Sequence, residues 1–379
     1  MKVAIVHDFL MQMGGAEKVV EVLHDMFPEA PIYTSAYDAD AMPDYYRTWD
    51  IRTSFLQRLP LKRYSHRLVL LLYTLAFESF DLTEYDLVIS SSSAFAKGVI
   101  TQPHTTHICY THAPMRFAWT GRSYMKNEKA SLGIRLLLLP GLHYLRNWDL
   151  MASTRVDHYI ANSTVVSDRI DKFYRRSCNI VFPPVETLRF RLAEAVKDYY
   201  IIVSRFVPYK RLDMAIQAFN MLGLPLKVVG QGRQRKALEA MAGPNIEFLG
   251  RVDDVALPQL LAQAKGYIMP GEEDFGIAPV EANACGVPVI ALAAGGALDT
   301  QIDGVTGVLF HDRSAESLCA AVRCAETITF DRKAIREHAL QFDTSIFKEG
   351  IARLITEKMF DSTTALVRHP VSRPEVLST

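Results

Sequence analysis

Two carboxylates, Glu273 and Glu281, flank a glycine turn in the sequence EEDFGIAPVE. If Gly276 ends a loop and a helix begins near Ile277, Glu273 lies in the loop and Glu281 lies a turn inside the helix. The backbone N–H groups around Phe275 and Gly276 then lack intrahelical partners and suit an anion, while the carboxylates accept hydrogen bonds from hydroxyl groups. The pattern predicts a sugar-nucleotide site. The alternative is an ordinary helix start with acidic residues in its first turn.

A pair of cations carries a related signal. Arg205 and Lys210 lie five residues apart, around the proline of SRFVPYKR. Because arginine offers a bidentate fork and lysine a point charge, the two could clamp a diphosphate and neutralise the charge of a departing nucleoside diphosphate. A solvated basic turn is the alternative.

Two glycine turns follow apolar runs. Gly230 and Gly232 form a tight turn in which missing side chains would let a nucleotide approach the backbone. Neither this turn nor Gly14–Gly15 has the third glycine of the dinucleotide fingerprint. Nicotinamide and flavin cofactors are therefore disfavoured.

The elements that must position these residues alternate between strand-like and helix-like segments. The first unit is an apolar run at 3–6, a loop, and a stretch to residue 27 with apolar residues at helical spacing. Further runs occur at 87–89, 99–100, 107–110 and 158–160, and a second series at 199–203, 226–229, 246–249, 267–269 and 287–290. We expect an α/β fold with two doubly wound, Rossmann-like domains, whose ligands bind beyond the carboxyl ends of the strands.

The adjacent prolines Pro183 and Pro184 interrupt the first series. Two prolines cannot continue a helix or a central strand, so we place the domain junction there. This assigns residues 1–183 to the first domain and 184–345 to the second.

Composition bounds the class of protein. The 379 residues are 49% hydrophobic and 22% charged, enough for two cores, and 42 basic residues balance 42 acidic ones. Global charge therefore gives no sign of nucleic-acid binding. The five cysteines contain no C-x2-C pair, which speaks against a zinc site or a disulfide framework and fits a reducing cytoplasm. The N-terminus lacks the apolar core of a signal peptide, and no segment has the roughly 18 continuous apolar residues of a membrane span.

The motifs together resemble one known family. The order of SRFVPYKR, VVGQGRQRKALE, FLGRV and EEDFGIAPVEANACGVPVIA is similar to the retaining glycosyltransferases of family 4, which have the GT-B fold of two Rossmann-like domains facing across a cleft. HDFL, GGAEKV, YTHAPMRFAW and IANSTVVSDRI are similar to its bacterial mannosyltransferase-like branch, which builds polysaccharides. The resemblance implies that residues 346–379 form a helix crossing back toward the first domain, followed by a tail.

The resemblance also implies a donor site. Arg205 and Lys210 would hold the donor diphosphate. Glu281 would accept hydrogen bonds from the ribose, and Glu273 from a hydroxyl of the transferred sugar. The other donor-binding positions would be Gly14, Gly15, Gly230, Gly232, Phe275, Gly276 and Ile277.

On the acceptor side, His112 in the sequence YTHAP would contact the reacting sugar and stabilise the transition state, completing a catalytic set with the diphosphate cations and the sugar-binding glutamate. The alternative is a histidine that caps the loop before the proline. His7, Asp8 and Arg116 are weaker candidates for acceptor contacts. The chain has Thr120 where many relatives carry an acid.

The implied reaction moves a hexose from a nucleoside diphosphate sugar, by branch resemblance mannose from GDP-mannose, to a hydroxyl of a glycan or polyprenyl-diphosphate-linked acceptor. Double displacement would need a carboxylate nucleophile, and no carboxylate of the first domain is an obvious candidate. We therefore expect a front-face route in which the leaving phosphate accepts the acceptor's proton. We expect no metal and no other cofactor, because no D-x-D element occurs in a suitable loop and Asp253–Asp254 fits a helix start. The rivals are a sugar-nucleotide epimerase or hydrolase of the same fold, and a non-catalytic sugar-nucleotide-binding module.

A basic and apolar stretch suggests a membrane partner. Arg58, Lys62, Arg63 and Arg67 lie beside leucines and tyrosines, as in helices that associate with anionic membranes. A core helix with a basic, solvated end is the alternative. We expect a cytoplasmic protein able to associate with the inner face of the membrane.

Overall fold

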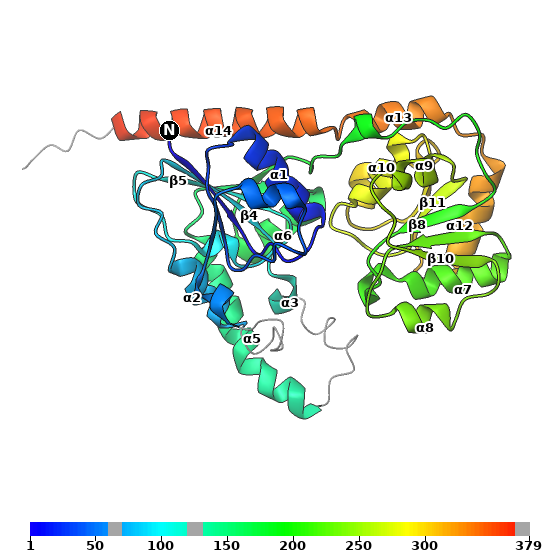
Figure 1. Cartoon of the computed structure of the whole chain (residues 1–379), viewed down its shortest axis with the longest axis horizontal. Helices are drawn as coiled ribbons and strands as arrows, with labels where there is room; N and C mark the ends of the chain where they lie inside the picture. The colour runs from blue at the N-terminus through cyan, green and yellow to red at the C-terminus, as the bar shows by residue number, and fades with distance from the viewer. Residues whose placement is uncertain (60–69, 120–131, 368–379) are drawn as a thin grey trace, which may run out of the picture.

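The computed structural model describes residues 1–59, 70–119 and 132–367. These residues form two parallel β-sheets, each covered by helices on both faces, which lie side by side as two domains (Figure 1). The predicted α/β class with two Rossmann-like halves is confirmed.

The sheet of the first domain has the strand order β3-β2-β1-β4-β5-β6-β7. Every neighbouring pair is parallel, and chain order reverses between β1 and β4. The strands are β1 (Val3–His7), β2 (Ile32–Thr34), β3 (Ile51–Thr53), β4 (Leu87–Ser92), β5 (Thr106–Thr111), β6 (His158–Ala161) and β7 (Cys178–Ile180).

The sheet of the second domain repeats this pattern in the order β10-β9-β8-β11-β12-β13, with the reversal between β8 and β11. The strands are β8 (Tyr200–Val203), β9 (Leu226–Val229), β10 (Ile246–Gly250), β11 (Gly266–Met269), β12 (Val289–Leu292) and β13 (Gly307–Phe310). Ligands of doubly wound folds bind where chain order reverses, so two such points define where a site is expected.

Helices cover the sheets because each turns an apolar face inward. In α1, for example, Val19, Val20 and Leu23 are fully buried against the first sheet. The α-helices are α1 (Gly15–Met26), α2 (Leu72–Glu78), α3 (Arg116–Trp119), α5 (Leu132–Ser153), α6 (Thr164–Tyr174), α7 (Leu212–Leu222), α8 (Arg235–Glu239), α9 (Ala256–Ala262), α10 (Ile277–Ala284), α11 (Ala297–Thr300), α12 (Ala315–Thr327), α13 (Arg332–Leu340) and α14 (Thr344–Val367). Short 3-10 turns are η1 (Asp44–Thr48), η2 (Phe55–Arg58), η3 (Ala96–Gly98), η4 (Thr187–Arg189) and η5 (Pro208–Lys210).

The sequence predicted most strands but not all. The expected strand at 99–100 is wrong, because Val99 is buried in an irregular segment after η3, where its side chain packs into the first-domain core. The three-residue strands β2, β3 and β7 and the strand β13 were not predicted. Runs of three residues carry too little pattern to identify a strand.

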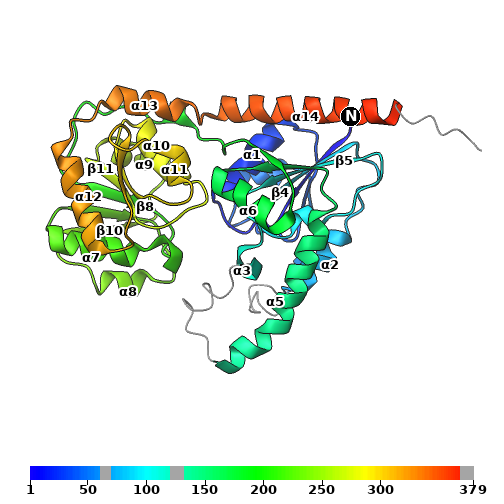
Figure 2. The same cartoon turned by 180° about the vertical axis from the view of Figure 1, so that it is seen from behind.

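The chain passes between the domains twice at one place. The segment after β7 and the segment before α14 run together: the N–H of Val185 donates to the carbonyl of Phe342 at 3.0 Å, and the N–H of Thr344 donates to the carbonyl of Val185 at 3.1 Å. Helix α14 then lies along the first domain (Figures 1 and 2), where Phe347 and Ile351 are buried in the same core as β1.

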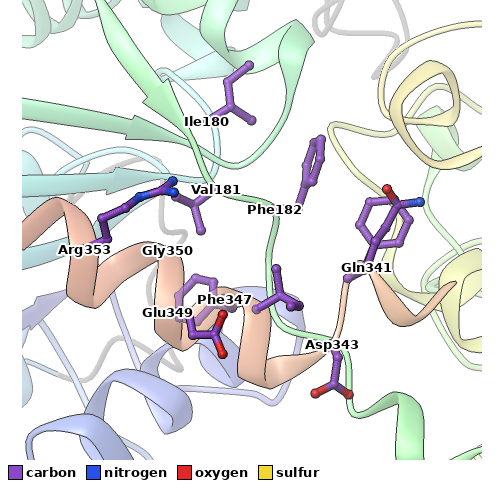
Figure 3. Close-up of a pocket in the computed structure, with 11 residues that line it drawn as sticks. Ile180, Val181, Phe182, Gln341, Asp343, Phe347, Glu349, Gly350 and Arg353 are labelled. Atoms are coloured by element: carbon purple, nitrogen blue, oxygen red, sulfur yellow. The ribbon is translucent and has the colours of Figure 1, made fainter. Parts of the chain in front are cut away.

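A crevice of about 420 Å³ lies at this double crossing. Figure 3 shows side chains of residues 180–182, at the end of β7 and the start of the linker, facing those of residues 341–353. Its lining comes from Ile180 at the end of β7, from the linker that follows, and from residues 341–353, which include the start of α14. The crevice therefore flanks the place where the chain crosses between the domains.

Candidate active site between the two domains

In the first domain, three side chains meet where the strand order reverses. His7 ends β1, Ser91 lies beside it in β4, and His112 directly follows β5. The Ser91 Oγ lies 3.1 Å from His7 Nδ1 and 2.7 Å from His112 Nε2. His7 Nδ1 also lies 3.0 Å from the Ser91 carbonyl, which can only accept, so this nitrogen carries a proton. The hydroxyl of Ser91 thus joins both predicted histidines.

The environment of His112 favours an uncharged ring. Burial, and secondarily the neighbouring His7, lowers the pKa of His112 to about 3. The imidazole is therefore neutral at physiological pH. It can exchange hydrogen bonds with a sugar hydroxyl but brings no positive charge to the site.

Asp8, predicted as an acceptor contact, is instead held inside the first domain. Its carboxylate accepts hydrogen bonds of 2.5 to 3.0 Å from the backbone N–H groups of Ser93, Ala94, Phe95 and Ala96. Both oxygens are engaged and the residue is only 2% exposed. The prediction is corrected: Asp8 fixes the turn after β4 rather than facing a ligand.

In the second domain, the predicted helix start is confirmed. Gly276 precedes α10 with a φ of +94°, a conformation that favours glycine, and no side chain caps the helix. Phe275 is buried and packs on Phe182 with ring centroids 5.6 Å apart, which anchors the loop before the helix. The N-terminus of α10 is thus left to other hydrogen-bond acceptors.

The predicted acid and base of this domain are in contact. Lys210, at the end of η5, forms an ion pair with Glu273 in the loop before α10, and both side chains are mostly buried. Arg205 is exposed, and its Nη2 lies 3.5 Å from the hydroxyl of Tyr209. The loop after β8 therefore carries its two cations beside the carboxylate loop after β11, at the second reversal of strand order.

Glu281 has a partner in the other domain. Its Oε1 accepts a hydrogen bond of 3.2 Å from Lys18 Nζ, and its side chain is 8% exposed. Lys18, which lies in α1 just beyond the glycine loop, was not among the predicted site residues.

The glycine loop of the first domain reaches the same place. A Cβ on Gly15 would lie 2.9 Å from Ile277 Cδ1, so the start of α1 touches the start of α10. Gly14 is the N-cap of α1, and no side chain caps that helix either. Two helix N-termini from opposite domains therefore meet, an arrangement that favours an anion between them.

Gly230 and Gly232 pack closely against the loop after β8, and their contact with a donor stays a prediction. A Cβ on Gly230 would lie 1.9 Å from the Ser204 carbonyl oxygen, and one on Gly232 would lie 2.4 Å from the Phe206 carbonyl oxygen. The missing side chains admit the backbone of the loop after β8, so these glycines shape the cation loop. An open hollow of about 560 Å³ borders the same turn, lined by Gln231, Gly232, Arg233 and Arg235.

Arginines of the first domain contact the acidic loop before α10. Arg116 Nη1 donates to Asp274 Oδ2 at 3.0 Å, and Arg169 of α6 donates to Asp274 Oδ1. Arg169 also reaches Glu272 at 3.3 Å. Arg116 was predicted as an acceptor contact, whereas nothing in the sequence singled out Arg169 or Asp274.

Some predicted residues lie outside the described ranges, and the predictions about metals are not tested by the structure. Thr120, Lys62, Arg63 and Arg67 lie outside the described residues. Among the residues that are described, no group of three or more His, Cys, Asp or Glu side chains is placed to hold a metal ion. No helix in the described ranges combines the length and apolar character needed to cross a bilayer. That the reaction needs no metal stays a prediction.

Comparison with known proteins assigns the second domain. Residues 185–342 match the family model described as glycosyl transferases group 1. The chain is 27% identical over 172 residues to an uncharacterized glycosyltransferase of Methanocaldococcus jannaschii, covering 44% of this chain and 49% of that protein. It is 31% identical over 163 residues to the GDP-mannose-dependent alpha-(1-6)-phosphatidylinositol monomannoside mannosyltransferase of Mycolicibacterium smegmatis, covering 37% and 43%. The chain thus spans about half the length of the curated relatives it matches.

Solved structures extend the similarity to the whole fold. HepE of Anabaena, crystallised with UDP, superposes with a TM-score of 0.70 at 18% identity, covering 94% of this chain and 100% of that one. This likeness concerns architecture alone. Residues 185–342 are therefore a glycosyltransferase group 1 domain, set in a chain with the two-domain GT-B fold.

Proposed function

We propose that this protein is a retaining hexosyltransferase that moves a hexose from a nucleoside diphosphate sugar to a hydroxyl acceptor. The observation that carries the proposal is the pairing of Lys210 with Glu273 beside the uncapped N-terminus of α10, within the group 1 domain. The first domain contributes the N-terminus of α1, which touches the start of α10, and carries the neutral His112 directly after β5.

Each group has a chemical task in the transfer. Arg205, Lys210 and the helix N-termini would bind the diphosphate and stabilise the negative charge that grows as it leaves. Glu273 and Glu281 would accept hydrogen bonds from the hexose and the ribose. His112, being uncharged, would orient a sugar hydroxyl. The leaving phosphate would take the acceptor's proton on the same face of the sugar, which retains the anomeric configuration. This front-face route needs no metal.

GDP-mannose is the proposed donor, and a lipid-linked glycan of bacterial polysaccharide synthesis is the proposed acceptor. Similarity to a GDP-mannose-dependent enzyme that acts on phosphatidylinositol monomannoside supports both choices. A panel of GDP- and UDP-sugars tests the donor by thermal stabilisation, since a ligand at a hundred times its Kd stabilises by about 2.7 kcal/mol. GDP-mannose is expected to give the largest shift; a larger shift with a UDP-sugar would assign a different donor.

Transfer itself is tested with the preferred donor and a set of polyprenyl-diphosphate-linked glycans. We expect an α-linked product from an α-linked donor, as measured by NMR, and unchanged turnover in EDTA. Glu273→Gln and Lys210→Met are expected to lower kcat by about a hundredfold or more. Lys227→Met, which alters an ion pair with Glu247 elsewhere in the domain, is the matched control. An inverted product, or full activity of both site variants, would refute the proposal.

The rival reactions differ in what they do to the donor alone. An epimerase or hydrolase would consume it rapidly without an acceptor, whereas a transferase would hydrolyse it slowly. A non-catalytic binding module would show the same low turnover for the wild type and for Glu273→Gln. Following the donor by chromatography with and without acceptor separates these cases.

We also propose that the first domain associates with an anionic membrane surface. Phe55 is 43% exposed and Leu75 is 53% exposed, and Leu59 and Leu71 are also exposed, next to Arg58. Apolar side chains beside a cation suit the boundary between headgroups and acyl chains. Flotation with anionic vesicles at low salt should recover the wild type and much less of Phe55→Ser/Leu75→Ser. Equal recovery of both proteins, or none of the wild type, would contradict this.

A further inference from the structure

The acidic loop before α10 is held by cations from the first domain. Asp274 accepts from Arg116 through Oδ2 and from Arg169 through Oδ1, so one carboxylate joins two arginines of the other domain. Its side chain is 16% exposed and that of Arg169 is 18% exposed. Screening by solvent is therefore limited, and charge-assisted hydrogen bonds of this kind are strong.

Asp274 and Arg116 each lie close in sequence to a proposed catalytic residue. Asp274 directly follows Glu273, and Arg116 lies four residues beyond His112 at the start of α3. The guanidinium of Arg116 also lies 5.4 Å from the ring centroid of Tyr209, in the loop that carries Arg205. Arg116 therefore touches both loops of the donor site while belonging to the histidine loop.

Helix α6 fixes the other arginine. Its N-terminus is bound by the second domain, since Thr164 donates to Asp299 through its N–H at 2.9 Å and also through its hydroxyl. Arg169 lies further along α6 and contacts both Asp274 and Glu272. The helix thus contacts the second domain at two points. Because Arg169 is part of this helix, its side chain cannot keep its contact with Asp274 if the domains separate.

We propose that Asp274 and Arg169 are a positioning pair that sets the relation between Glu273 and the histidine loop, and so makes transfer depend on domain closure. The inference rests on the proposed transferase reaction. Asp274 and Arg169 touch no reacting atom; they act through Glu273 and Arg116. A displacement of reacting groups by about 1 Å can cost a hundredfold in rate, so loss of this pair should affect transfer more than donor binding.

The test uses uncharged variants of similar shape in the full chain. Asp274→Asn and Arg169→Gln should each lower kcat for transfer about ten- to hundredfold, with the donor KM changed less than about threefold. The double variant should be no worse than either single one, because residues that act as one unit are non-additive. Arg169→Lys should recover part of the rate.

Arg313→Gln is the matched control. Arg313 donates to Glu272 at 2.6 Å on the same acidic loop, but both residues of this pair belong to the second domain. Its turnover should stay within about twofold of the wild type. Equal losses in Arg313→Gln and Asp274→Asn, or fully additive losses in the double variant, would overturn the inference.

A readout independent of activity separates this inference from the proposed function. Without ligand, small-angle scattering should show a larger radius of gyration for Asp274→Asn and Arg169→Gln than for the wild type and Arg313→Gln. If the wild type transfers no sugar but the two variants still open, the positioning pair stands as a closure device and the proposed function fails. If the wild type is active, and the variants show neither a larger radius of gyration nor a lower kcat, the pair is not a positioning device.

Discussion

Lys18 and Glu281, 263 positions apart in the chain, lie 3.2 Å apart across the domain interface. Glu281 is the carboxylate expected to bind the ribose, and its side chain is nearly buried. The contact between the domains therefore supplies its counter-charge. A carboxylate has further lone pairs, so Glu281 can accept from a ribose hydroxyl while it keeps Lys18.

Lys18→Met should weaken donor binding. It removes a hydrogen bond to a charged group that is worth about 1.5 kcal/mol or more, so we expect the donor KM to rise about tenfold with a smaller change in kcat. Steady-state kinetics measure both. Lys265→Met is the control, because Lys265 is about as exposed as Lys18 and pairs with Glu326 inside the second domain. An unchanged donor KM in Lys18→Met would show that the contact contributes nothing to binding.

Lys97→Met should destabilise the first domain strongly. Lys97 and Asp149 form a fully buried ion pair, and removing one partner leaves an uncompensated charge at a cost of about 3 to 5 kcal/mol. Lys348→Met breaks the exposed pair with Asp25 and should cost about 1 kcal/mol or less. Urea unfolding gives both free energies. Equal costs would contradict the assignment of Lys97 to the core.

Gly230→Ala should disrupt the donor domain. The new methyl group would meet the Ser204 carbonyl oxygen, and the φ of +125° is unfavourable for any other residue. Gly304 has a positive φ of +73° but open space where a Cβ would lie. Gly304→Ala therefore measures only the cost in folding free energy of placing alanine in this backbone conformation, about 1 kcal/mol. A lower melting temperature for Gly230→Ala than for Gly304→Ala is expected. The reverse order would mean that the two loops are not packed as described.

The free energy of unfolding should fall as the pH drops below about 6.5, which is the ordinary pKa of a histidine side chain. Burial lowers the pKa of His107 to about 4, and burial with His7 lowers that of His112 to about 3. Between these values and 6.5 the unfolded chain binds more protons than the folded one, so each histidine removes about 1.4 kcal/mol per pH unit. Above pH 6.5 the effect vanishes.

Urea unfolding at pH 7, 6 and 5 measures this dependence. His107→Gln should be less sensitive to acid than the wild type, and substitution of the exposed His104 by Gln should leave the sensitivity unchanged. Equal slopes for the wild type and His107→Gln would exclude His107 as a source of the acid sensitivity.

The sequence was sufficient for groups that act through local geometry. Gly276 and the helix start at Ile277 were predictable because a turn and an apolar helix are encoded by neighbouring residues. The contact of Lys210 with Glu273 could be expected because both follow strands that neighbour each other in a parallel sheet.

Contacts between domains could not be predicted in the same way. The pairing of Asp274 with Arg169 depends on how two separate sheets are oriented, which no local pattern encodes. The prediction for Asp8 failed for a related reason. Its position after β1 suggested a ligand contact, but its carboxylate accepts hydrogen bonds from backbone N–H groups of a turn more than eighty residues later. Type and spacing identify a residue that can do chemistry, and tertiary structure decides whether it is free to do so.

The way the chain crosses between the domains has a consequence for how the protein is made. The core containing Ile5 and Tyr110 is completed by Phe347 and Ile351 of α14. During synthesis the ribosome must therefore release the whole second domain before the first can bury this surface. Until then a nascent chain exposes the apolar surface of the first domain that α14 covers in the folded protein.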